Sequence, residues 1–481
     1  MAIRNIAGNI QPLLLSHLIV SVLFLLIIVE LDLTMNPLLI FVYGCLSAGL
    51  YFILLKNEWE ASRDLSVEIV YLAACFFRFI IPTFVTSWLI FNDIKIQYLE
   101  DDVSDYSFPT IVWMNIFHVI FYTIFKLKSN NISIGSRMRV LFKKYDVFFI
   151  VAAIYIICTP LRAFNNLLIF LNVSQAVMSL FNNIGNLCLI LLLFNCSYKY
   201  SPFRHFILIL LCATEFIYAG LFTFYKVNMI MPVLFYLVFW IVWHKSENKK
   251  VITKPFIVLC LSSFVLINSF IFPFMYAKRI VSGFSVEMDA GTNNYSMADV
   301  FDHMKSARSR ADDNSSTLLD RQNAVPVNSF FYKDVNCKNQ YHTEILKKSV
   351  LIAIPRIIYP GKPYNNVGMM VTEYVRTGIM FDDCVSTSYT YAGLVGGSYL
   401  WGGPIGLLLC AILGGFFMSA YNNFLLRNIK NPLAILFYMS FLVMALAAFE
   451  ETHDGGIGRL VSLIPITILV KITSLILMHK K

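Results

Sequence analysis

A proline-framed basic segment at residues 354–363 is the part of the sequence best suited to binding phosphate. It carries Arg356 and Lys362 among three prolines. Three prolines this close together exclude a regular helix and stiffen the backbone, so the two cations point in fixed directions. A guanidinium pairs with phosphate oxygens and stays charged. The segment is therefore a candidate site for the diphosphate of a lipid.

Carboxylates and a histidine follow this segment and are candidates for proton transfer to or from a sugar hydroxyl. Glu373 comes shortly after Lys362, and the stretch 450–459 holds Glu451, His453 and Asp454. Such groups act as general acids or bases when they lie within hydrogen-bond reach of the reacting oxygen. The alternative for all of these charged residues is that they are solvated and only anchor helix ends at a membrane surface.

Several other cations stand where a charge needs an explanation. Arg78 lies near the middle of an apolar segment, where a charge is costly and suggests a functional site. The alternative is a buried arginine paired with carbonyl groups or with a carboxylate of another helix. Lys226, Arg279 and Arg459 each lie at the end of an apolar segment, within reach of an anionic head group.

Motifs of soluble enzymes are missing from the sequence. It has no P-loop, no GxGxxG, no HExxH, no CxxC and no GxSxG. The histidine spacing suggests no metal site. We therefore expect neither a metal nor another cofactor.

The elements that must position these residues are membrane helices. Hydrophobic residues make up 58% of the 481 residues and charged residues only 14%, whereas a soluble domain is about 25% charged. This composition excludes a soluble globular protein and a disordered chain. The net charge of +9 is explained by Lys and Arg in cytoplasmic loops, so we expect no nucleic-acid partner.

A spanning helix needs about 20 mostly apolar residues. Twelve segments qualify, at 12–31, 37–55, 66–91, 109–126, 146–162, 175–195, 203–223, 228–244, 255–275, 391–419, 432–449 and 458–478. The fold class predicted is therefore an all-α integral membrane protein with about twelve transmembrane helices. Helices 1–9 occupy residues 1–275 and helices 10–12 occupy residues 391–481.

The distribution of Lys and Arg predicts the orientation. If the N-terminus is cytoplasmic, the cytoplasmic segments hold 19 of these residues and the short outer loops hold 4. This bias follows the positive-inside rule and puts both termini in the cytoplasm. Residues 276–390 then form one long outer loop, which we expect to be partly helical and to lie against the membrane surface.

Cys337 and Cys384 both fall in this long loop. If the outer side is a bacterial periplasm, a disulfide between them is compatible with the compartment. Sequence alone does not show whether the two residues are close.

At these residues the chain resembles a known family. An Ile-Pro-Arg step at 354–356 precedes Pro-Gly-Lys-Pro at 360–363, and a Ser/Thr-rich stretch at 386–390 leads into the next span. The last loop runs from an acidic pair to Gly-x-Gly-Arg, ending at Arg459. Together these features resemble the Wzy-type O-antigen polymerases of bacterial surface glycans and the related enterobacterial common antigen polymerase. The resemblance covers residues 276–462. Some members carry an arginine where this chain has Lys226.

The resemblance implies a metal-independent glycosyltransferase with a GT-C-like membrane fold. It would act at the periplasmic face of the bacterial inner membrane. Donor and acceptor would be glycan repeat units on undecaprenyl diphosphate, embedded in the lipid bilayer, and a partner would set chain length. In this reading Arg356, Lys362, Arg279 and Arg459, with Lys226, bind the diphosphate. Glu451, His453, Asp454 or Glu373 accepts the proton.

Three other readings remain open. An O-antigen ligase uses the same donor lipid and a similar architecture. Another lipid-linked glycosyltransferase is also compatible with the outer-face residues. A transporter or flippase is favoured by Arg78, although such proteins usually have internal repeats and broken helices near the membrane midplane. We see no repeat in this sequence.

Overall fold

Helices dominate the part of the chain that the structure describes, as the composition predicts. The computed structural model describes residues 2–61, 66–98, 101–128, 146–163, 175–222, 226–247, 249–282, 296–309, 325–338, 341–353, 370, 374, 393–428, 431, 434, 437–438, 468 and 470–472. Contacts group the chain into two units. Unit 1 comprises Met1–Ser62, Ser66–Ile132 and Leu319–Lys481, and unit 2 comprises Arg63–Leu65 and Ser133–Leu318.

Within the described residues, eight helices are long and apolar enough to cross a membrane. They are Gln11–Glu30, Pro37–Glu60, Val67–Phe91, Ser104–Leu127, Pro202–Phe222, Met229–Ser246, Lys254–Ser282 and Leu394–Arg427. Two shorter apolar helices, Phe148–Pro160 and Leu187–Tyr198, fall on two further predicted spans. The predicted spans at 432–449 and 458–478 lie almost wholly outside the described residues. The chain is thus a helical membrane protein, and the total of twelve spans stays a prediction.

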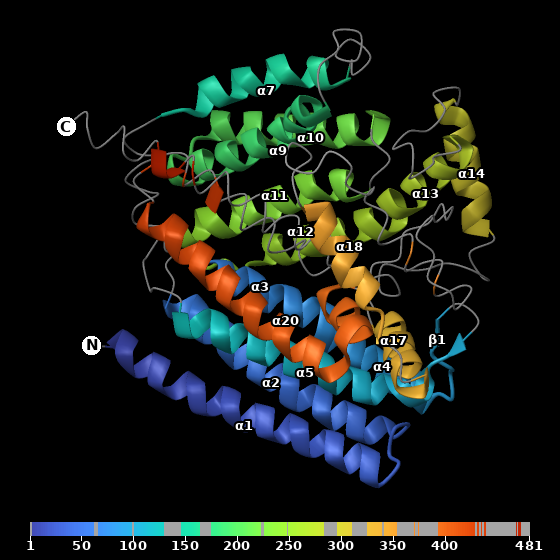
Figure 1. The fold of residues 1–481 in the computed structure, drawn as a ribbon. Coiled ribbons are helices and arrows are strands. Elements are labelled where there is room, and N and C mark those ends of the chain that lie inside the picture. Colours follow the sequence, from blue (N-terminus) through green and yellow to red (C-terminus); the bar gives the residue numbers. More distant parts are fainter. Residues whose placement is uncertain are drawn as a thin grey trace. The chain divides into compact units, whose positions relative to one another are not determined.

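Unit 1 is built around the membrane helices of the N-terminal third of the chain. Its elements are α1 (Ala2–Glu30), α2 (Pro37–Ala61), α3 (Val67–Cys75), the π-helix η1 (Phe76–Ile80), α4 (Ile81–Phe91), β1 (Gln97–Tyr98), β2 (Asp101–Asp102), α5 (Ser104–Lys128), α17 (Val325–Lys338), α18 (Thr343–Ala353) and α20 (Gly393–Arg427). Helix α5 contacts α1, α4, α17 and α20. Among the eight candidate spans in the described residues, this one is the most buried. Figure 1 shows α1, α2, α5 and α20 lying side by side.

Local sequence signals explain where these helices begin. The Asn36 side chain accepts a hydrogen bond from Leu39 N at 3.0 Å, and Pro37 occupies the first position of α2. Ser66 caps α3 in the same way through Ile69 N at 3.3 Å. Asn and Ser satisfy backbone N–H groups that a helix start leaves free, and proline there has no N–H to lose.

Unit 1 has two small irregular features, a pair of short strands before α5 and a kink within α20. Strands β1 and β2 form an antiparallel pair, and Lys95 bridges to Asp102 at 3.1 Å. Helix α20 is kinked at Gly403, whose φ of 56° is a conformation that favours glycine. A Cβ at this glycine would meet the Tyr341 ring at 2.8 Å.

Unit 2 holds the second group of membrane helices. Its elements are α7 (Phe148–Ala163), α9 (Gln175–Tyr198), α10 (Pro202–Phe222), α11 (Lys226–Ser246), α12 (Lys254–Leu266), the π-helix η2 (Ile267–Ile271), α13 (Phe272–Ser282) and α14 (Met297–Ser309). Helix α9 packs on α7, α10 and α11. The ninth span continues through η2 and α13 to Ser282 rather than ending near residue 275.

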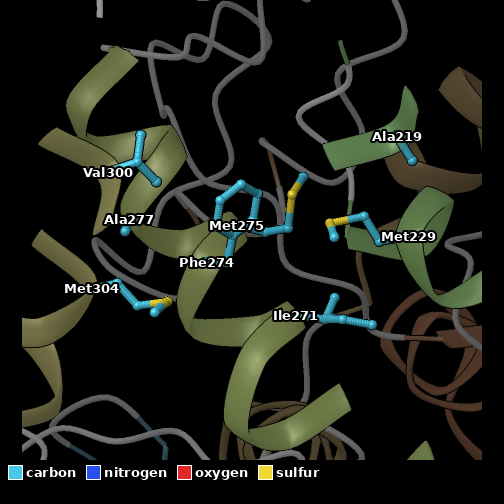
Figure 2. Close-up of a cluster of buried hydrophobic side chains, with 8 residues drawn as sticks. All are labelled: Ala219, Met229, Ile271, Phe274, Met275, Ala277, Val300 and Met304. Carbon is cyan, nitrogen blue, oxygen red and sulfur yellow. The ribbon is translucent and has the colours of Figure 1, made fainter. Parts of the chain in front are cut away.

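The extension of this span has a partner in the long loop. Helix α14 packs on α13, where Val300 and Met304 bury against Ala277 and Phe274 in one apolar cluster (Figure 2). Ser296 and Asp299 form a reciprocal capping box at the start of α14, with Asp299 N donating to Ser296 Oγ at 3.1 Å. The expectation that the loop is partly helical is confirmed for α14, α17 and α18.

Candidate functional site

Most of the predicted site residues lie outside the described part of the chain. They are Arg356, Lys362, Glu373, Cys384, Glu451, His453, Asp454 and Arg459. The diphosphate-binding and proton-transfer roles assigned to them therefore stay predictions. Lys226, Arg279, Arg78 and Cys337 fall within described elements.

Lys226 and Arg279 lie in the region of unit 2 where the end of α10, the start of α11 and α13 meet, which we call the α10–α13 junction. Lys226 is the first residue of α11, and Arg279 lies in α13; the side chains of both fall outside the described residues. Their neighbour Lys278 is fully buried. Its Nζ donates to the carbonyl oxygens of Gly220 at 2.8 Å and Leu221 at 2.9 Å. A lysine thus binds the last carbonyls of α10, where the helix dipole favours a cation.

An apolar contact closes the same junction. Met229, one turn into α11, packs against Gly220 and belongs to the same cluster as Phe274 of α13 (Figure 2). The end of α10, the start of α11 and α13 therefore converge. The fold brings the backbones of Lys226, Lys278 and Arg279 into one region, and the diphosphate-binding role of Lys226 and Arg279 stays a prediction.

Arg78 lies within the π-helix η1 and is half-buried. Its charge interacts with Cys75 of α3 and His118 of α5. π-Helical turns inside longer helices occur frequently at functional sites. The predicted intramembrane charge thus sits among polar side chains of unit 1.

Cys337 is exposed on α17, and its Sγ lies 3.2 Å from the Tyr106 hydroxyl. Cys384 is outside the described residues. The disulfide between the two stays a prediction.

The described residues contain a buried hydrogen-bond chain that no sequence motif predicts. It begins at Glu344, where His342 Nδ1 approaches Glu344 Oε1 at 2.9 Å. His342 Nε2 lies 2.8 Å from the Tyr374 hydroxyl, which in turn donates to Asp334 Oδ2. Lys338 closes the chain with Nζ 2.7 Å from Asp334 Oδ1. We call these five residues the His342 chain.

The ends of the His342 chain reach solvent, while its middle does not. Side-chain exposure is 45% for Glu344 and 47% for Lys338 but only 4% for His342. Tyr374 and Asp334 are also buried. Buried polar groups cost free energy unless they are hydrogen-bonded, and each of these has a partner. A solvent-facing carboxylate is thus connected to a buried acid–base network.

Burial, charges and hydrogen bonds within the His342 chain shift the pKa values of its members. Burial opposes charge on Asp334, but hydrogen bonds from His342, Lys338 and Tyr374 lower its pKa to about 2. Burial likewise opposes the His342 imidazolium, yet the carboxylates of Asp334 and Glu344 raise the pKa of His342 above its usual value. With Glu344 on one ring nitrogen and the Tyr374 oxygen on the other, both nitrogens donate. This arrangement favours the imidazolium form of His342.

Three helices hold the His342 chain in place. Asp334 and Lys338 are one turn apart on α17, and Glu344 is in the first turn of α18, where a carboxylate is favoured by the helix dipole. His342 N donates to Leu400 O of α20 at 3.0 Å. The backbone of the histidine is thus tied to the helix that follows the long loop.

Basic residues follow Glu344 on the same helix. Lys347 and Lys348 lie three and four positions after it, so they share its face of α18. Lys347 is exposed. In the sequence, α18 ends at Ala353, three residues before Arg356, so cations and a carboxylate occur close together along this part of the loop.

Aromatic side chains surround α17 next to the His342 chain. Tyr332 packs against Tyr399 of α20 with ring centroids 5.1 Å apart, and Tyr106 lies 6.3 Å from Tyr332. Trp113 of α5 lies 6.4 Å from Tyr399. Asn336 Nδ2 donates to the Tyr399 hydroxyl at 3.2 Å. Aromatic rings with polar tips and an amide are groups that carbohydrates bind well.

Sequence spacing could not have revealed this site. Asp334 and Tyr374 lie 40 positions apart and are joined only by tertiary contacts. The one available signal was His342, which the sequence places in the long loop. Among the described residues, no group of His, Cys, Asp and Glu is arranged to hold a metal ion.

Comparison with known proteins adds one finding. A family profile described as "Domain of unknown function (DUF8712)" matches residues 128–423, more than half of the chain. Searches among curated proteins and among solved structures gave no match. The chain therefore belongs to the DUF8712 family, a domain of unknown function.

Proposed function

We propose that this protein is a glycosyltransferase that polymerises oligosaccharide repeat units carried on undecaprenyl diphosphate. The reaction would take place at the periplasmic face of a bacterial inner membrane, within a GT-C-like fold. The observation that carries the proposal is the His342 chain, which links a solvent-facing carboxylate to buried acid–base groups, two of them on α17, the helix that also carries Tyr332 of the aromatic cluster. The resemblance of residues 276–462 to O-antigen polymerases supplies the substrate class.

In this proposal the acceptor sugar hydroxyl attacks the anomeric carbon of the donor glycan. A new C–O bond forms to the acceptor, and the bond from the anomeric carbon to the diphosphate oxygen breaks. Glu344 accepts the proton of the attacking hydroxyl, and undecaprenyl diphosphate leaves with the bonding electron pair. General-base catalysis of this kind contributes roughly 10²- to 10⁴-fold to the rate.

The other members of the His342 chain position Glu344. His342 Nδ1 hydrogen-bonds the Glu344 carboxylate, and Tyr374 and Asp334 hold the imidazole ring in place. Arg356 and Lys362, with Lys347 on α18, would meet the negative charge that develops on the leaving diphosphate. A chain-length regulator is the expected partner.

A reconstituted assay tests this proposal. The full-length chain in liposomes is incubated with a lipid-linked repeat unit, and the products are separated by gel. We expect a ladder of polymers from the wild type and a loss of at least about 10²-fold for Glu344→Gln. Tyr374→Phe, which removes a positioning hydroxyl, should shift the pH profile of activity as well as lower the rate.

A matched control uses another loop carboxylate. Asp302 is 77% exposed and pairs only at 3.7 Å with Lys305, so Asp302→Asn should keep full activity. Equal activity of Glu344→Gln and Asp302→Asn would overturn the role of Glu344.

Deletion in the native host separates the alternatives. Collapse of the surface glycan to a single repeat unit on its acceptor indicates a polymerase. Complete loss of attached glycan, with polymer accumulating on the lipid carrier, indicates a ligase. An unchanged glycan ladder contradicts both, and a transport assay would follow.

A further inference from the structure

A groove lies along the second half of α20, the helix that follows the long loop. Its volume is about 370 Å³, and the described residues that line it are Phe416, Ala420, Asn423, Phe424 and Arg427. Binding sites for small molecules commonly have volumes of about 300–1,000 Å³. The groove is therefore large enough to hold part of a ligand and not only single water molecules. We call it the α20 groove.

One face of α20 forms this lining. Residues three or four positions apart lie on the same face of a helix, and positions 416, 420, 423, 424 and 427 follow that spacing. Ala420 carries only a methyl group, which leaves room between the larger side chains of Phe416 and Phe424. Phe416 and Ala420 are exposed, and Phe424 is half-buried. A ligand can therefore reach the apolar part of the α20 groove.

The polar end of the α20 groove coincides with the end of a membrane span. Arg427 is the last residue of the candidate span Leu394–Arg427, and its side chain is exposed. Phe416 lies eleven residues earlier, which corresponds to a rise of about 16 Å along the helix. Half of a hydrocarbon core of about 30 Å is about 15 Å. The groove thus has the length of one lipid leaflet, with its cation at the end of the span.

Nothing in the described part of the chain neutralises Arg427. No carboxylate there forms an ion pair with it, and the sequence from Cys384 to Phe449 contains no Asp or Glu. The last turn of α20 does not need the guanidinium either, because Asn428 Nδ2 donates to the Phe424 carbonyl oxygen at 2.8 Å. The positive charge of Arg427 is therefore available to an anionic ligand.

A phospholipid matches both parts of the α20 groove. A guanidinium binds two phosphate oxygens at once, and the Asn423 side chain adds an amide one turn before it. The acyl chain would lie on Phe416, Ala420 and Phe424. A zwitterionic lipid would bring a cationic group next to Arg427, where α20 offers no carboxylate for it. We infer that the α20 groove binds a glycerophospholipid with a net negative headgroup, whose phosphate is held by Arg427.

This lipid is distinct from the substrates of the proposed transfer. The predicted orientation puts Arg427 on the cytoplasmic side, whereas Glu344 belongs to the long outer loop. The bound phospholipid would hold the end of α20 at the membrane surface. Its binding is measured without any glycan, so the result does not depend on whether the protein is a transferase.

Photo-cross-linking locates the lipid. Full-length protein is reconstituted in phosphatidylcholine liposomes that contain a small fraction of phosphatidylglycerol with a diazirine on its acyl chain. After illumination, the labelled peptides are identified by mass spectrometry. We expect labelling of residues 416–427 that unlabelled phosphatidylglycerol suppresses and additional phosphatidylcholine does not. Suppression by the competitor separates a binding site from general contact with the bilayer.

Substitutions separate the two parts of the α20 groove. Arg427→Gln should lower the suppressible labelling about fivefold, which corresponds to the attraction of one arginine to anionic lipid. Arg427→Lys keeps the charge and should retain most of the labelling. Ala420→Trp keeps the cation but fills the groove, so it should lower the labelling as well. If Ala420→Trp does not fold, the two substitutions of the exposed Arg427 decide the question.

The chain offers a matched control for each substitution. Lys56 is an exposed cation near the end of α2, and Ala213 is an exposed small residue on α10. Lys56→Gln removes a positive charge and Ala213→Trp adds a bulky side chain, both away from the α20 groove. Each should leave the labelling of residues 416–427 unchanged.

Four results would overturn the inference. Labelling of residues 416–427 that unlabelled phosphatidylglycerol does not suppress shows only general contact with lipid. Equal labelling of the wild type and Arg427→Gln shows that the cation does not hold the headgroup. An equal loss in Lys56→Gln shows that total charge, and not the groove, attracts the lipid. Suppression by undecaprenyl phosphate but not by phosphatidylglycerol shows that the occupant is a polyprenyl lipid.

Discussion

Gly415 of α20 packs directly on the backbone of Phe121 in α5. A Cβ at Gly415 would stand 2.6 Å from the Phe121 carbonyl oxygen and 3.0 Å from Ile124 Cβ. The adjacent Gly414 meets the Phe121 ring in the same way, at 2.8 Å. Small residues allow membrane helices to approach closely, and this contact sets how near α20 comes to α5.

Replacing this glycine should weaken the contact. Gly415→Ala places a methyl group against backbone that has little freedom to move, so we expect a loss of about 1–3 kcal/mol in stability. Thermal unfolding of the detergent-solubilised protein measures it. Gly402 on the same helix has nothing within 4 Å of an added Cβ, so Gly402→Ala is the control. Equal melting temperatures for the two variants would show that α20 and α5 accommodate a methyl group at Gly415 without loss of stability.

Lys278 offers a second test of packing in unit 2. Because its ammonium binds two carbonyl oxygens at the end of α10, Lys278→Met leaves those groups unsatisfied inside the protein. We expect a loss of about 2 kcal/mol, measured as a lower melting temperature. The exposed Lys254 provides the comparison, since Lys254→Met should change stability by less than about 0.5 kcal/mol. A neutral Lys278→Met would contradict the buried contact.

Asp334 is expected to stabilise the His342 chain. Its carboxylate accepts from Tyr374 and pairs with Lys338 at 2.7 Å. Asp334→Asn removes the charge and keeps the shape, and we expect a loss of about 2 kcal/mol. Hydrogen exchange followed by mass spectrometry should show increased exchange in α17 and at residues 341–345. Unchanged exchange there would mean that the carboxylate is not a structural partner of His342.

The pKa shifts of this chain predict a pH optimum for stability. His342 has a raised pKa, so its stabilisation is complete below about pH 6.5 and is lost as pH rises through the folded-state pKa. Asp334 has a lowered pKa, so its stabilisation is complete above about pH 3.9 and is lost as pH falls through about 2. The His342 chain should therefore stabilise the protein most between about pH 4 and 6.5.

Melting temperatures across pH test this expectation. Between pH 6 and 9 the wild type should lose more stability than His342→Gln, because the variant has no imidazolium to deprotonate. His303→Gln is the control, since it changes a histidine on α14 outside the chain. A wild-type profile that follows His342→Gln over this range would contradict the raised pKa of His342.

Composition and hydropathy determined the membrane class and placed the apolar helices among those that the structure describes. A segment of about 20 apolar residues has few alternatives to a spanning helix, because lipid leaves backbone groups no other partners. The predicted spans from 12–31 to 255–275 and at 391–419 all coincide with described helices. Prolines and caps at Asn36 and Ser66 also mark helix starts in the sequence, because their effect is local.

The sites depended on tertiary contacts. The His342 chain joins α17, α18 and Tyr374, and the buried hydrogen bonds of Asn115 join α1, α2 and α5, so neither network has a spacing that repeats along the sequence. On α5 the positions of Asn115, His118, Tyr122 and Lys126 share one helical face, but the sequence does not say which helix that face meets. Hydropathy is a property of each segment alone, whereas a hydrogen-bond network exists only once packing brings its donors and acceptors within about 3 Å.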